Sequence, residues 1–274
     1  MSYESAGKIW RQKSNRNMKQ LIQRWLRFFG YQLQDLRKFG RDPWRDLQIL
    51  LQAVPAPVCF DVGAHRGETI RSLIEHFPKA TIHAFEPDPD NFAALQAATK
   101  NLPRTNTYPL AMGDQPARAK LIKTQLSMSN SLLPAAASLQ SAAHKKIGEV
   151  EITVTTLDHF CREHKVNAID LLKTDCQGFD LRVLKGATTL LSEGRVRVIQ
   201  CESFFVAEYE GQAWFYEIVQ FLASLDYVPV SFGDPERNAL HEIMWSDVIF
   251  KRRGAINLAR LEADEKVRPR VHDT

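Results

Sequence analysis

The sequence predicts an α/β protein built on a doubly wound, mainly parallel sheet, and two observations support this prediction. Short apolar runs rich in β-forming residues alternate along the chain with stretches of helical periodicity. Helices between buried strands join parallel neighbours and cover both faces of the sheet. Acidic residues also follow several of the apolar runs, at the sheet edge where such folds bind their ligands.

Three strands and two helices are predicted in the first half of the sheet. The run VCFDV has the composition of a strand that is covered on both faces, and two further runs follow it. The first helix starts at about Gly67, and Asp88–Asp90 caps the second. The expected strands are Val58–Val62, Thr81–Phe85 and Thr107–Ala111, and the helices reach Phe77 and Ala98.

An insertion and four further strands are predicted in the second half of the chain. A continuous apolar run enters a turn at Asp175, and the last two strands form an antiparallel pair that completes a sheet of seven. In chain order we expect the extra strands Lys120–Gln125 and Glu149–Thr155, the helix Leu157–His164, the strand Ile169–Thr174, the helix Phe179–Leu191, the strand Val196–Glu202, the helix Ala213–Leu225 and the strands Tyr227–Ser231 and Asp247–Lys251.

The turn after the first strand has the features of a nucleoside-binding site. Gly63 and Gly67 allow the backbone to turn sharply and to approach a ligand closely. Glu86 ends the next strand, where a carboxylate can accept hydrogen bonds from a ribose diol. A nicotinamide dinucleotide needs G-x-G-x-x-G for its pyrophosphate, and Asp61 would repel that group. S-adenosylmethionine carries an ammonium group, a ribose and no phosphate, so it suits both acids.

Four segments carry a resemblance to a known family. DVGAHRGE, AFEPDPDNF, LAMGD and LLKTDCQGFD occur in this order, and the chain resembles the FkbM-type S-adenosylmethionine-dependent methyltransferases from about Val58 to Lys251. The resemblance implies a Rossmann-like sheet of the class I methyltransferase type and methyl transfer to a hydroxyl of a sugar, glycolipid or polyketide-like metabolite. In the family the fourth segment usually reads K-x-D-x-E-G-x-E, whereas this chain has Gln177 and Asp180 at the glutamate positions.

Nine positions are predicted to bind the cofactor. Asp61 and Gly63 are expected to border its methionine moiety, and backbone N–H groups at the helix N-terminus face its carboxylate. Glu86 is expected to hold the ribose hydroxyls. Asp114 either approaches the adenine amino group or serves only a turn. The complete set is Asp61, Gly63, Ala64, Gly67, Thr69, Glu86, Pro87, Gly113 and Asp114.

Catalysis is assigned to Asp175 and Lys173. Asp175 is expected to be the general base or the group that orients the acceptor, with Lys173 as its charge partner; a structural ion pair is the alternative. Gln177 and Glu202 are expected near the acceptor. A divalent cation on Asp175 and Glu202 is left open, and no metal ligand is assigned, because Gln177 replaces an acid that a hard cation prefers.

The acceptor is expected to meet a loop of the insertion. The resemblance implies a loop that covers the site there, and Ser129, Asn130 and Ser131 would offer short polar groups to a hydroxylated acceptor; a capped turn is the alternative. His65 and His144 are further candidate neighbours of the acceptor. Two other classes of function stay open, namely a nicotinamide oxidoreductase and a non-catalytic cofactor-binding protein.

Composition excludes several classes of protein. The four cysteines form no C-x-x-C pair, so neither a zinc knuckle nor a disulfide framework is indicated. No apolar run is long enough to span a bilayer, and no signal-peptide pattern opens the chain, so we expect a cytoplasmic protein with reduced thiols. With 274 residues, 44% of them hydrophobic, the chain can bury one good-sized core.

The positive charge is concentrated at the N-terminus. Residues 1–53 contain 11 Lys/Arg and 4 Asp/Glu, whereas the remainder is mildly acidic. Within them, KQLIQRWLRFF has an apolar helical stripe flanked by Arg24 and Arg27. This helix either packs on the main domain or a second subunit, or meets anionic lipid or an acidic partner; no nucleic-acid motif accompanies it. We therefore divide the chain into a basic helical arm (1–53), a methyltransferase domain (54–252) and a polar mobile tail (253–274).

Overall fold

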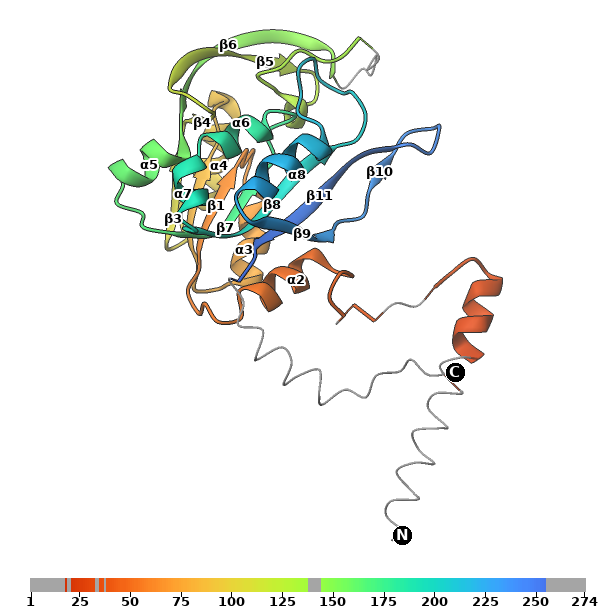
Figure 1. The fold of residues 1–274 in the computed structure, drawn as a ribbon. Helices are drawn as coiled ribbons and strands as arrows, with labels where there is room; N and C mark the ends of the chain where they lie inside the picture. The colour runs from red at the N-terminus through yellow and green to blue at the C-terminus, as the bar shows by residue number, and fades with distance from the viewer. Residues whose placement is uncertain (1–17, 19–20, 33–34, 37, 138–143, 255–274) are drawn as a thin grey trace.

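The computed structural model describes residues 18, 21–32, 35–36, 38–137 and 144–254. Its centre is an eight-stranded sheet in the order β10-β11-β8-β7-β1-β2-β3, with β9 also paired to β11 (Figure 1). The first five strands of the sheet along the chain run parallel, and β11 is antiparallel to β8, β9 and β10. The sheet comprises β1 (Val58–Val62), β2 (Thr81–Phe85), β3 (Thr105–Tyr108), β7 (Ile169–Thr174), β8 (Val196–Phe204), β9 (Tyr227–Phe232), β10 (Glu236–Arg237) and β11 (Ile243–Arg252).

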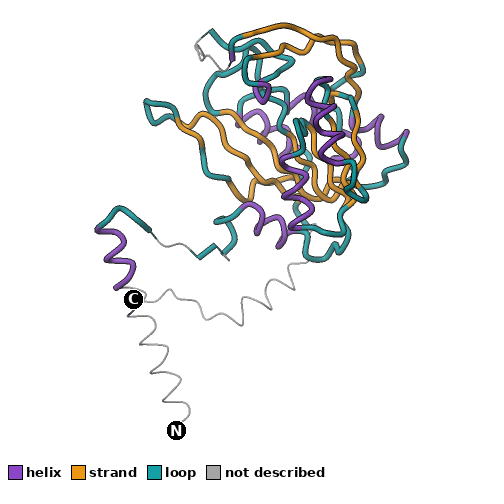
Figure 2. The backbone as a smooth tube through the Cα atoms, turned by 180° about the vertical axis from the view of Figure 1, so that it is seen from behind, coloured by secondary structure: helices purple, strands orange, loops and turns teal. Residues whose placement is uncertain are grey.

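The predicted fold class is therefore confirmed, including the closing antiparallel pair of β9 and β11. The short strand β10 is the one addition to the seven expected strands of this sheet. Helices pack on both faces of the sheet, as Figure 2 shows from behind. They are α2 (Pro43–Leu50), α3 (Glu68–His76), α4 (Pro89–Thr99), α5 (Leu157–Glu163), α6 (Asp180–Lys185), α7 (Thr188–Ser192) and α8 (Phe215–Ser224).

Two expected elements are divided in the structure. The strand predicted over Thr107–Ala111 ends at Tyr108, because Pro109 lacks the N–H that would continue the ladder. The helix predicted over Phe179–Leu191 is split into α6 and α7 at Gly186. An added Cβ at Gly186 would lie 2.0 Å from the carbonyl oxygen of Gly113, so this close approach requires glycine.

The insertion forms a second, three-stranded sheet with the order β4-β6-β5. It consists of β4 (Ala111–Met112), β5 (Ala117–Thr124) and β6 (Lys146–Thr155), and the short 3-10 helix η1 (Ser127–Ser129) follows β5. Both predicted extra strands are present, and each begins three residues earlier than expected. Figure 1 shows β5 and β6 above one end of the central sheet.

The region before β1 divides into two parts. Leu47 and Leu50 of α2 belong to the buried core on one face of the sheet, and the buried Asp46 carboxylate accepts a hydrogen bond from Ser231 of β9. The N-terminal helix at residues 21–28 instead exposes Trp25 and Phe28, which are 65% and 84% accessible. Figures 1 and 2 show this helix apart from the sheet domain.

No helix in the described part of the chain combines the length and the apolar character that crossing a membrane requires. Of the predicted mobile tail, only residues 253 and 254 fall within the described ranges, so residues 255–274 lie outside them.

Candidate functional site

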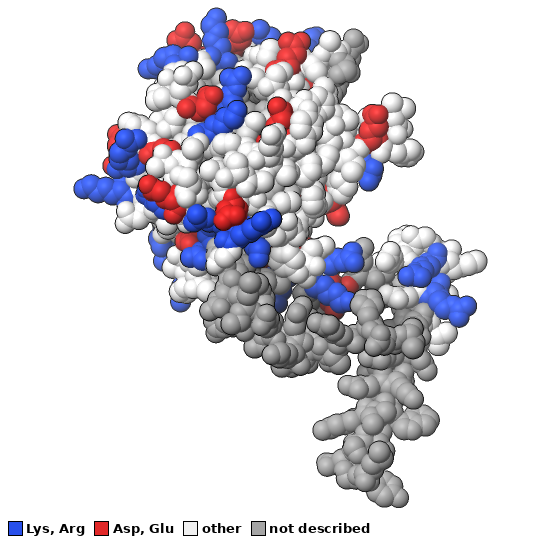
Figure 3. Space-filling view, in the orientation of Figure 1, with Lys and Arg blue, Asp and Glu red and all other residues white. Residues whose placement is uncertain are grey.

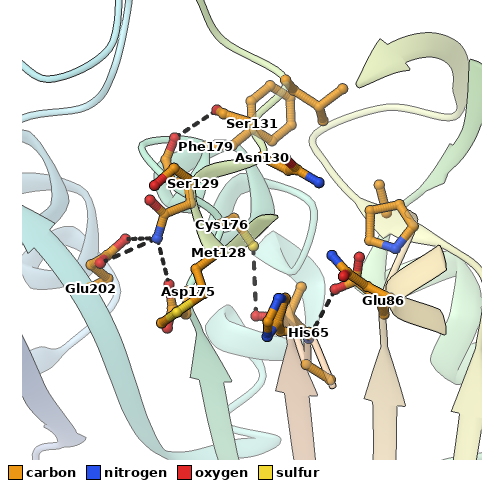
Figure 4. A pocket seen from close by; sticks show the side chains of 18 of the residues that line it. His65, Glu86, Met128, Ser129, Asn130, Ser131, Asp175, Cys176, Phe179 and Glu202 are labelled. Carbon is orange, nitrogen blue, oxygen red and sulfur yellow. Dashed lines mark hydrogen bonds between the residues drawn. The ribbon is translucent and has the colours of Figure 1, made fainter. Parts of the chain in front are cut away.

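The register of the parallel strands brings four strand ends together. Val62 of β1 pairs with both Phe85 of β2 and Thr174 of β7, and Thr174 pairs with Cys201 of β8. The residues that follow these positions therefore meet at one edge of the sheet. A cavity of about 520 Å³ lies there, between the strand ends and the loop around η1 (Figure 4).

Eleven of the predicted site residues line this cavity. They come from the turn after β1, the end of β2, the η1 loop and the ends of β7 and β8. They are Gly63, Ala64, Thr69, Glu86, Pro87, Ser129, Asn130, Ser131, Asp175, Gln177 and Glu202, and the two histidines suggested as neighbours of the acceptor, His65 and His144, line it too.

Five predicted residues lie outside the cavity. Gly67 adopts a left-handed conformation as the N-cap of α3, and a Cβ added there would lie 3.2 Å from Leu95 of α4. Gly113 is wedged against Val154 and Phe179, and Asp114 is exposed. An added Cβ at Gly113 would lie 2.8 Å from Val154 Cγ1, so this position leaves no room for a side chain.

Asp61 and Lys173 lie beneath the cavity rather than in its wall. They are direct partners in the β1–β7 register, so both side chains enter the same face of the sheet. Both carboxylate oxygens of Asp61 are buried without a hydrogen-bond partner, and its Oδ1 lies 3.8 Å from Lys173 Nζ. Burial raises the pKa of Asp61 to about 6, although the Lys173 charge opposes that rise.

The turn at Gly63 is held by backbone hydrogen bonds from both neighbouring strands. The N–H groups of Gly63 and Ala64 donate to the Phe85 carbonyl, and the Asp175 N–H donates to the Val62 carbonyl. Gly63 has φ +84°, and an added Cβ would lie 2.0 Å from the Asp175 carbonyl oxygen. The closeness of these two turns therefore depends on the missing side chain at position 63.

Glu86 is a buried carboxylate at the cavity wall. Its Oε2 accepts from the His65 N–H at 2.9 Å (Figure 4), and its Oε1 accepts from the Asp88 N–H at 2.9 Å. Burial raises the pKa of Glu86 to about 7, and the two N–H donors limit that rise. Each carboxylate oxygen has a second lone pair, so Glu86 can accept further hydrogen bonds, such as those from a pair of hydroxyl groups.

Replacing Glu86 by glutamine is expected to weaken S-adenosylhomocysteine binding by about 1–3 kcal/mol, the scale of hydrogen bonds to a charged group. The ionised form of Glu86 predominates only above about pH 7. The affinity of the wild-type protein for S-adenosylhomocysteine is therefore expected to rise about tenfold from about pH 6 to about pH 8. Calorimetry at both pH values checks this. The exposed Glu75→Gln variant should keep the pH dependence, whereas a pH-independent wild type would exclude Glu86 as the ribose ligand.

Asp175 is the centre of a polar network at the opposite wall. Its Oδ2 accepts from Lys173 Nζ at 3.1 Å, and its Oδ1 accepts from Gln177 Nε2 at 3.0 Å. The same amide nitrogen lies 3.2 Å from Oε2 of Glu202, and the Tyr209 hydroxyl donates to Oε1 of Gln177. Tyr209 therefore fixes the Gln177 amide with its N–H groups toward both carboxyls.

The charges in this network differ from one carboxyl to the next. Burial alone would raise the pKa of Asp175, but the Lys173 ammonium and the Gln177 amide hold it below its ordinary value. Burial, together with the charges of Asp175, Asp180 and Asp247, raises the pKa of Glu202 well above its ordinary value. The network thus places a carboxyl with a lowered pKa, Asp175, beside one with a raised pKa, Glu202, so that Asp175 carries negative charge more readily than its neighbour.

The η1 loop is attached to the site by its polar side chains. Ser131 Oγ donates to the Gln177 carbonyl and accepts from the Leu133 N–H. The Asn130 amide bridges the Thr124 N–H and the Asp88 carboxylate, and Ser127 Oγ lies 2.8 Å from His65 Nε2. Ser131 and Asn130 therefore position the loop over the cavity.

Sequence reasoning missed several cavity residues, among them Glu208, Trp245 and Asp247. The strand pattern could have found Asp247, since it lies directly opposite Glu202 in the β8–β11 pair. Glu208 lies in the loop between β8 and α8, where no periodicity marks it. Within the described ranges, no three His, Cys, Asp or Glu side chains are grouped so that they could hold a metal ion.

The cavity fits S-adenosylmethionine in two respects. It offers the buried carboxylate of Glu86, which can accept hydrogen bonds from a ribose diol, and a turn at Gly63 that has no side chain and lies against the Asp175 backbone. The turn contains no second and third glycine in the spacing that a pyrophosphate needs.

Comparison with known proteins agrees with this chemistry. The family model for the methyltransferase FkbM domain matches residues 61–229. The 2-O-methyltransferase NoeI of Sinorhizobium fredii is 28% identical over 211 residues, which cover 71% of this chain and 86% of NoeI. The 31-O-demethyl-FK506 methyltransferase FkbM of Streptomyces tacrolimicus is 30% identical over 206 residues, which cover 66% of this chain and 76% of that protein.

A crystal structure of methyltransferase FkbM from Methylobacillus flagellatus is similar with a TM-score of 0.48 and 17% identity. The match covers 72% of this chain and 44% of that one, so this chain spans less than half of that protein. Because the family model matches more than half of the chain and includes the turn, Glu86 and Asp175, the chain belongs to the FkbM family of S-adenosylmethionine-dependent methyltransferases.

Proposed function

We propose that this protein transfers the methyl group of S-adenosylmethionine to a hydroxyl group of a sugar, glycolipid or polyketide-like acceptor. The observation that carries the proposal is one cavity with Glu86 at one wall and the Asp175 network at another. The relatives named for 2-O-methylation and for methylation of 31-O-demethyl-FK506 support oxygen as the receiving atom.

The protein's contribution is alignment and proton acceptance. S-adenosylmethionine supplies a methyl group on a positively charged sulfur. As the acceptor oxygen forms its bond to the methyl carbon, the carbon–sulfur bond breaks, its electron pair stays on sulfur, and the hydroxyl proton passes to Asp175. Holding oxygen, carbon and sulfur in line is the main source of rate in such a displacement.

Each member of the Asp175 network has a defined part in this proposal. Lys173 keeps Asp175 ionised before the reaction, and Asp61 beneath it helps to hold that buried ammonium. Gln177 donates to Asp175 and Glu202, so it fixes both carboxyls without adding the negative charge that a glutamate would bring. In this proposal, the glutamine at position 177 leaves Asp175 free to accept the proton.

The test is release of S-adenosylhomocysteine from the full-length protein with a panel of hydroxylated acceptors and isotope-labelled methyl donor. Label found in an ether linkage of the product supports the proposal. Label found on nitrogen or carbon, or cofactor binding without product from any acceptor, would contradict it.

We also propose that the N-terminal helix at residues 21–28 binds an anionic lipid surface. The exposed Trp25 and Phe28 lie beside the exposed Arg24 and Arg27, and Figure 3 shows basic side chains on this helix next to uncharged surface. Aromatic side chains favour the membrane interface, and arginine favours anionic headgroups.

Vesicle flotation checks the lipid contact. The protein is expected to float with phosphatidylglycerol vesicles and not with phosphatidylcholine vesicles, and Trp25→Ala should weaken this binding several-fold. Phe232→Ala, at an aromatic side chain that is 50% exposed on the sheet domain, serves as the control. Self-association in sedimentation that Trp25→Ala abolishes, without flotation, would assign the helix to a subunit contact instead.

A further inference from the structure

Four carboxyl side chains line the part of the cavity around the Asp175 network. Asp175 and Glu202 belong to that network, Asp247 lies on the neighbouring strand β11, and Glu208 lies in the loop after β8. No lysine or arginine of the described chain lines the cavity. The Lys173 ammonium, beneath the cavity, already pairs with Asp175 and Asp61 at 3.1 and 3.8 Å.

Glu208 differs from the other three in its partners. Asp175 and Glu202 share the Gln177 amide, and Asp247 accepts from Gln200 Nε2 at 3.0 Å. Glu208 is only 5% exposed, yet its Oε1 is buried with no hydrogen-bond partner. A buried carboxylate oxygen without a donor is unfavourable by itself, and a ligand in the cavity can supply that donor.

The loop that carries Glu208 is fixed in place. The backbone N–H of Glu208 donates to Gln212 Oε1 at 2.8 Å, and the Glu208 carbonyl accepts from the Ala136 N–H at 2.8 Å. The next residue, Tyr209, donates to Gln177. Glu208 is therefore carried by the same loop that orients the network around Asp175, and these backbone contacts fix its position at the cavity wall.

A second unpaired atom lies at the same wall. His144 Nδ1 is buried without a hydrogen-bond partner, and the His144 ring lies against Tyr209 with the ring centroids 6.1 Å apart. Burial lowers the pKa of His144, so the imidazole is neutral at neutral pH and one of its ring nitrogens can accept a hydrogen bond. Trp245 adds an aromatic wall of the kind that packs against the C–H face of a sugar ring.

We propose that Glu208 and His144 form an acceptor-recognition subsite for an uncharged saccharide whose hydroxyl group donates to Glu208. A uronic acid or a phosphorylated sugar is selected against, because its anion would lie among carboxyl groups with no lining cation. This inference rests on the proposed function, since the saccharide is the methyl acceptor of that reaction.

The experiment measures binding of the full-length, S-adenosylhomocysteine-loaded protein to immobilised glycans in matched pairs, each with an uncharged terminal sugar and its uronic-acid counterpart. We expect uncharged members to be retained at least about tenfold better than their uronates. Glu208→Gln should weaken that binding about tenfold, while Glu210→Gln, at an exposed acid two residues along the same loop, should leave it unchanged.

Thermal melting and S-adenosylhomocysteine affinity report whether each variant is folded. Glu208→Asp, which keeps the charge but withdraws the carboxylate, provides a second variant and should also lose affinity. Preference for uronates, unchanged binding by both Glu208 variants, or no binding to any uncharged glycan would overturn the subsite. Failure of the proposed methyl transfer is a separate outcome: the protein would bind the glycans but would not convert S-adenosylmethionine to S-adenosylhomocysteine in their presence.

Discussion

Asp175→Asn is expected to lower the turnover number about 10²–10⁴-fold, the range for loss of a general base. Asparagine keeps the shape of the side chain and can still meet the Gln177 amide, but it cannot accept the acceptor's proton. The affinity for S-adenosylhomocysteine should change little, because Glu86 and the Gly63 turn lie at other walls of the cavity. Steady-state release of S-adenosylhomocysteine and calorimetry separate the two quantities.

The control for this change is Asp234→Asn, at an exposed aspartate in the loop between β9 and β10. It should leave both turnover and cofactor affinity at wild-type values. A small drop in turnover of Asp175→Asn, with a lowered melting temperature, would instead assign Asp175 and Lys173 to a structural ion pair. The two outcomes are distinct, because a structural pair affects stability while a general base affects the rate.

The position of the site could be predicted from the sequence because parallel strands bring their ends to one edge. The apolar runs locate the ends of β1, β2, β7 and β8, and the residues that follow them must converge. That geometry is enough to place Gly63, Glu86 and Asp175 around one cavity. Membership of the FkbM family then removes the oxidoreductase alternative, which needed a phosphate-binding turn that the chain lacks.

The direction of individual side chains could not be predicted to the same degree. Asp61 and Lys173 are each one residue before the end of their strand, where side chains alternate between the two faces of the sheet. Which face holds them depends on the long-range register of β1 with β7 and not on local pattern. The position of Glu208 is determined by the hydrogen bonds of its irregular loop with Ala136 and Gln212. A local sequence pattern does not predict such contacts.

The effect of a methyl group at Gly63 tests the closeness of the two turns. Gly63→Ala is expected to destabilise the protein by about 2–4 kcal/mol and to reduce S-adenosylhomocysteine affinity strongly. The left-handed conformation, φ +84°, accounts for about 1–2 kcal/mol of that loss in a residue with a side chain. The rest arises because the new Cβ would lie 2.0 Å from the Asp175 carbonyl oxygen, which is backbone and cannot rotate away.

Gly211→Ala separates these two contributions. Gly211 has a similar φ of +73°, but no atom lies within 4 Å of its added Cβ, so the variant should show the conformational cost alone. Urea unfolding of both variants measures the difference in free energy of unfolding, and calorimetry measures S-adenosylhomocysteine affinity. Equal destabilisation by the two substitutions, with cofactor binding intact, would mean that the turns after β1 and β7 can move apart without a further loss of stability or of cofactor affinity. In that case the cavity would not depend on the approach of Gly63 to Asp175.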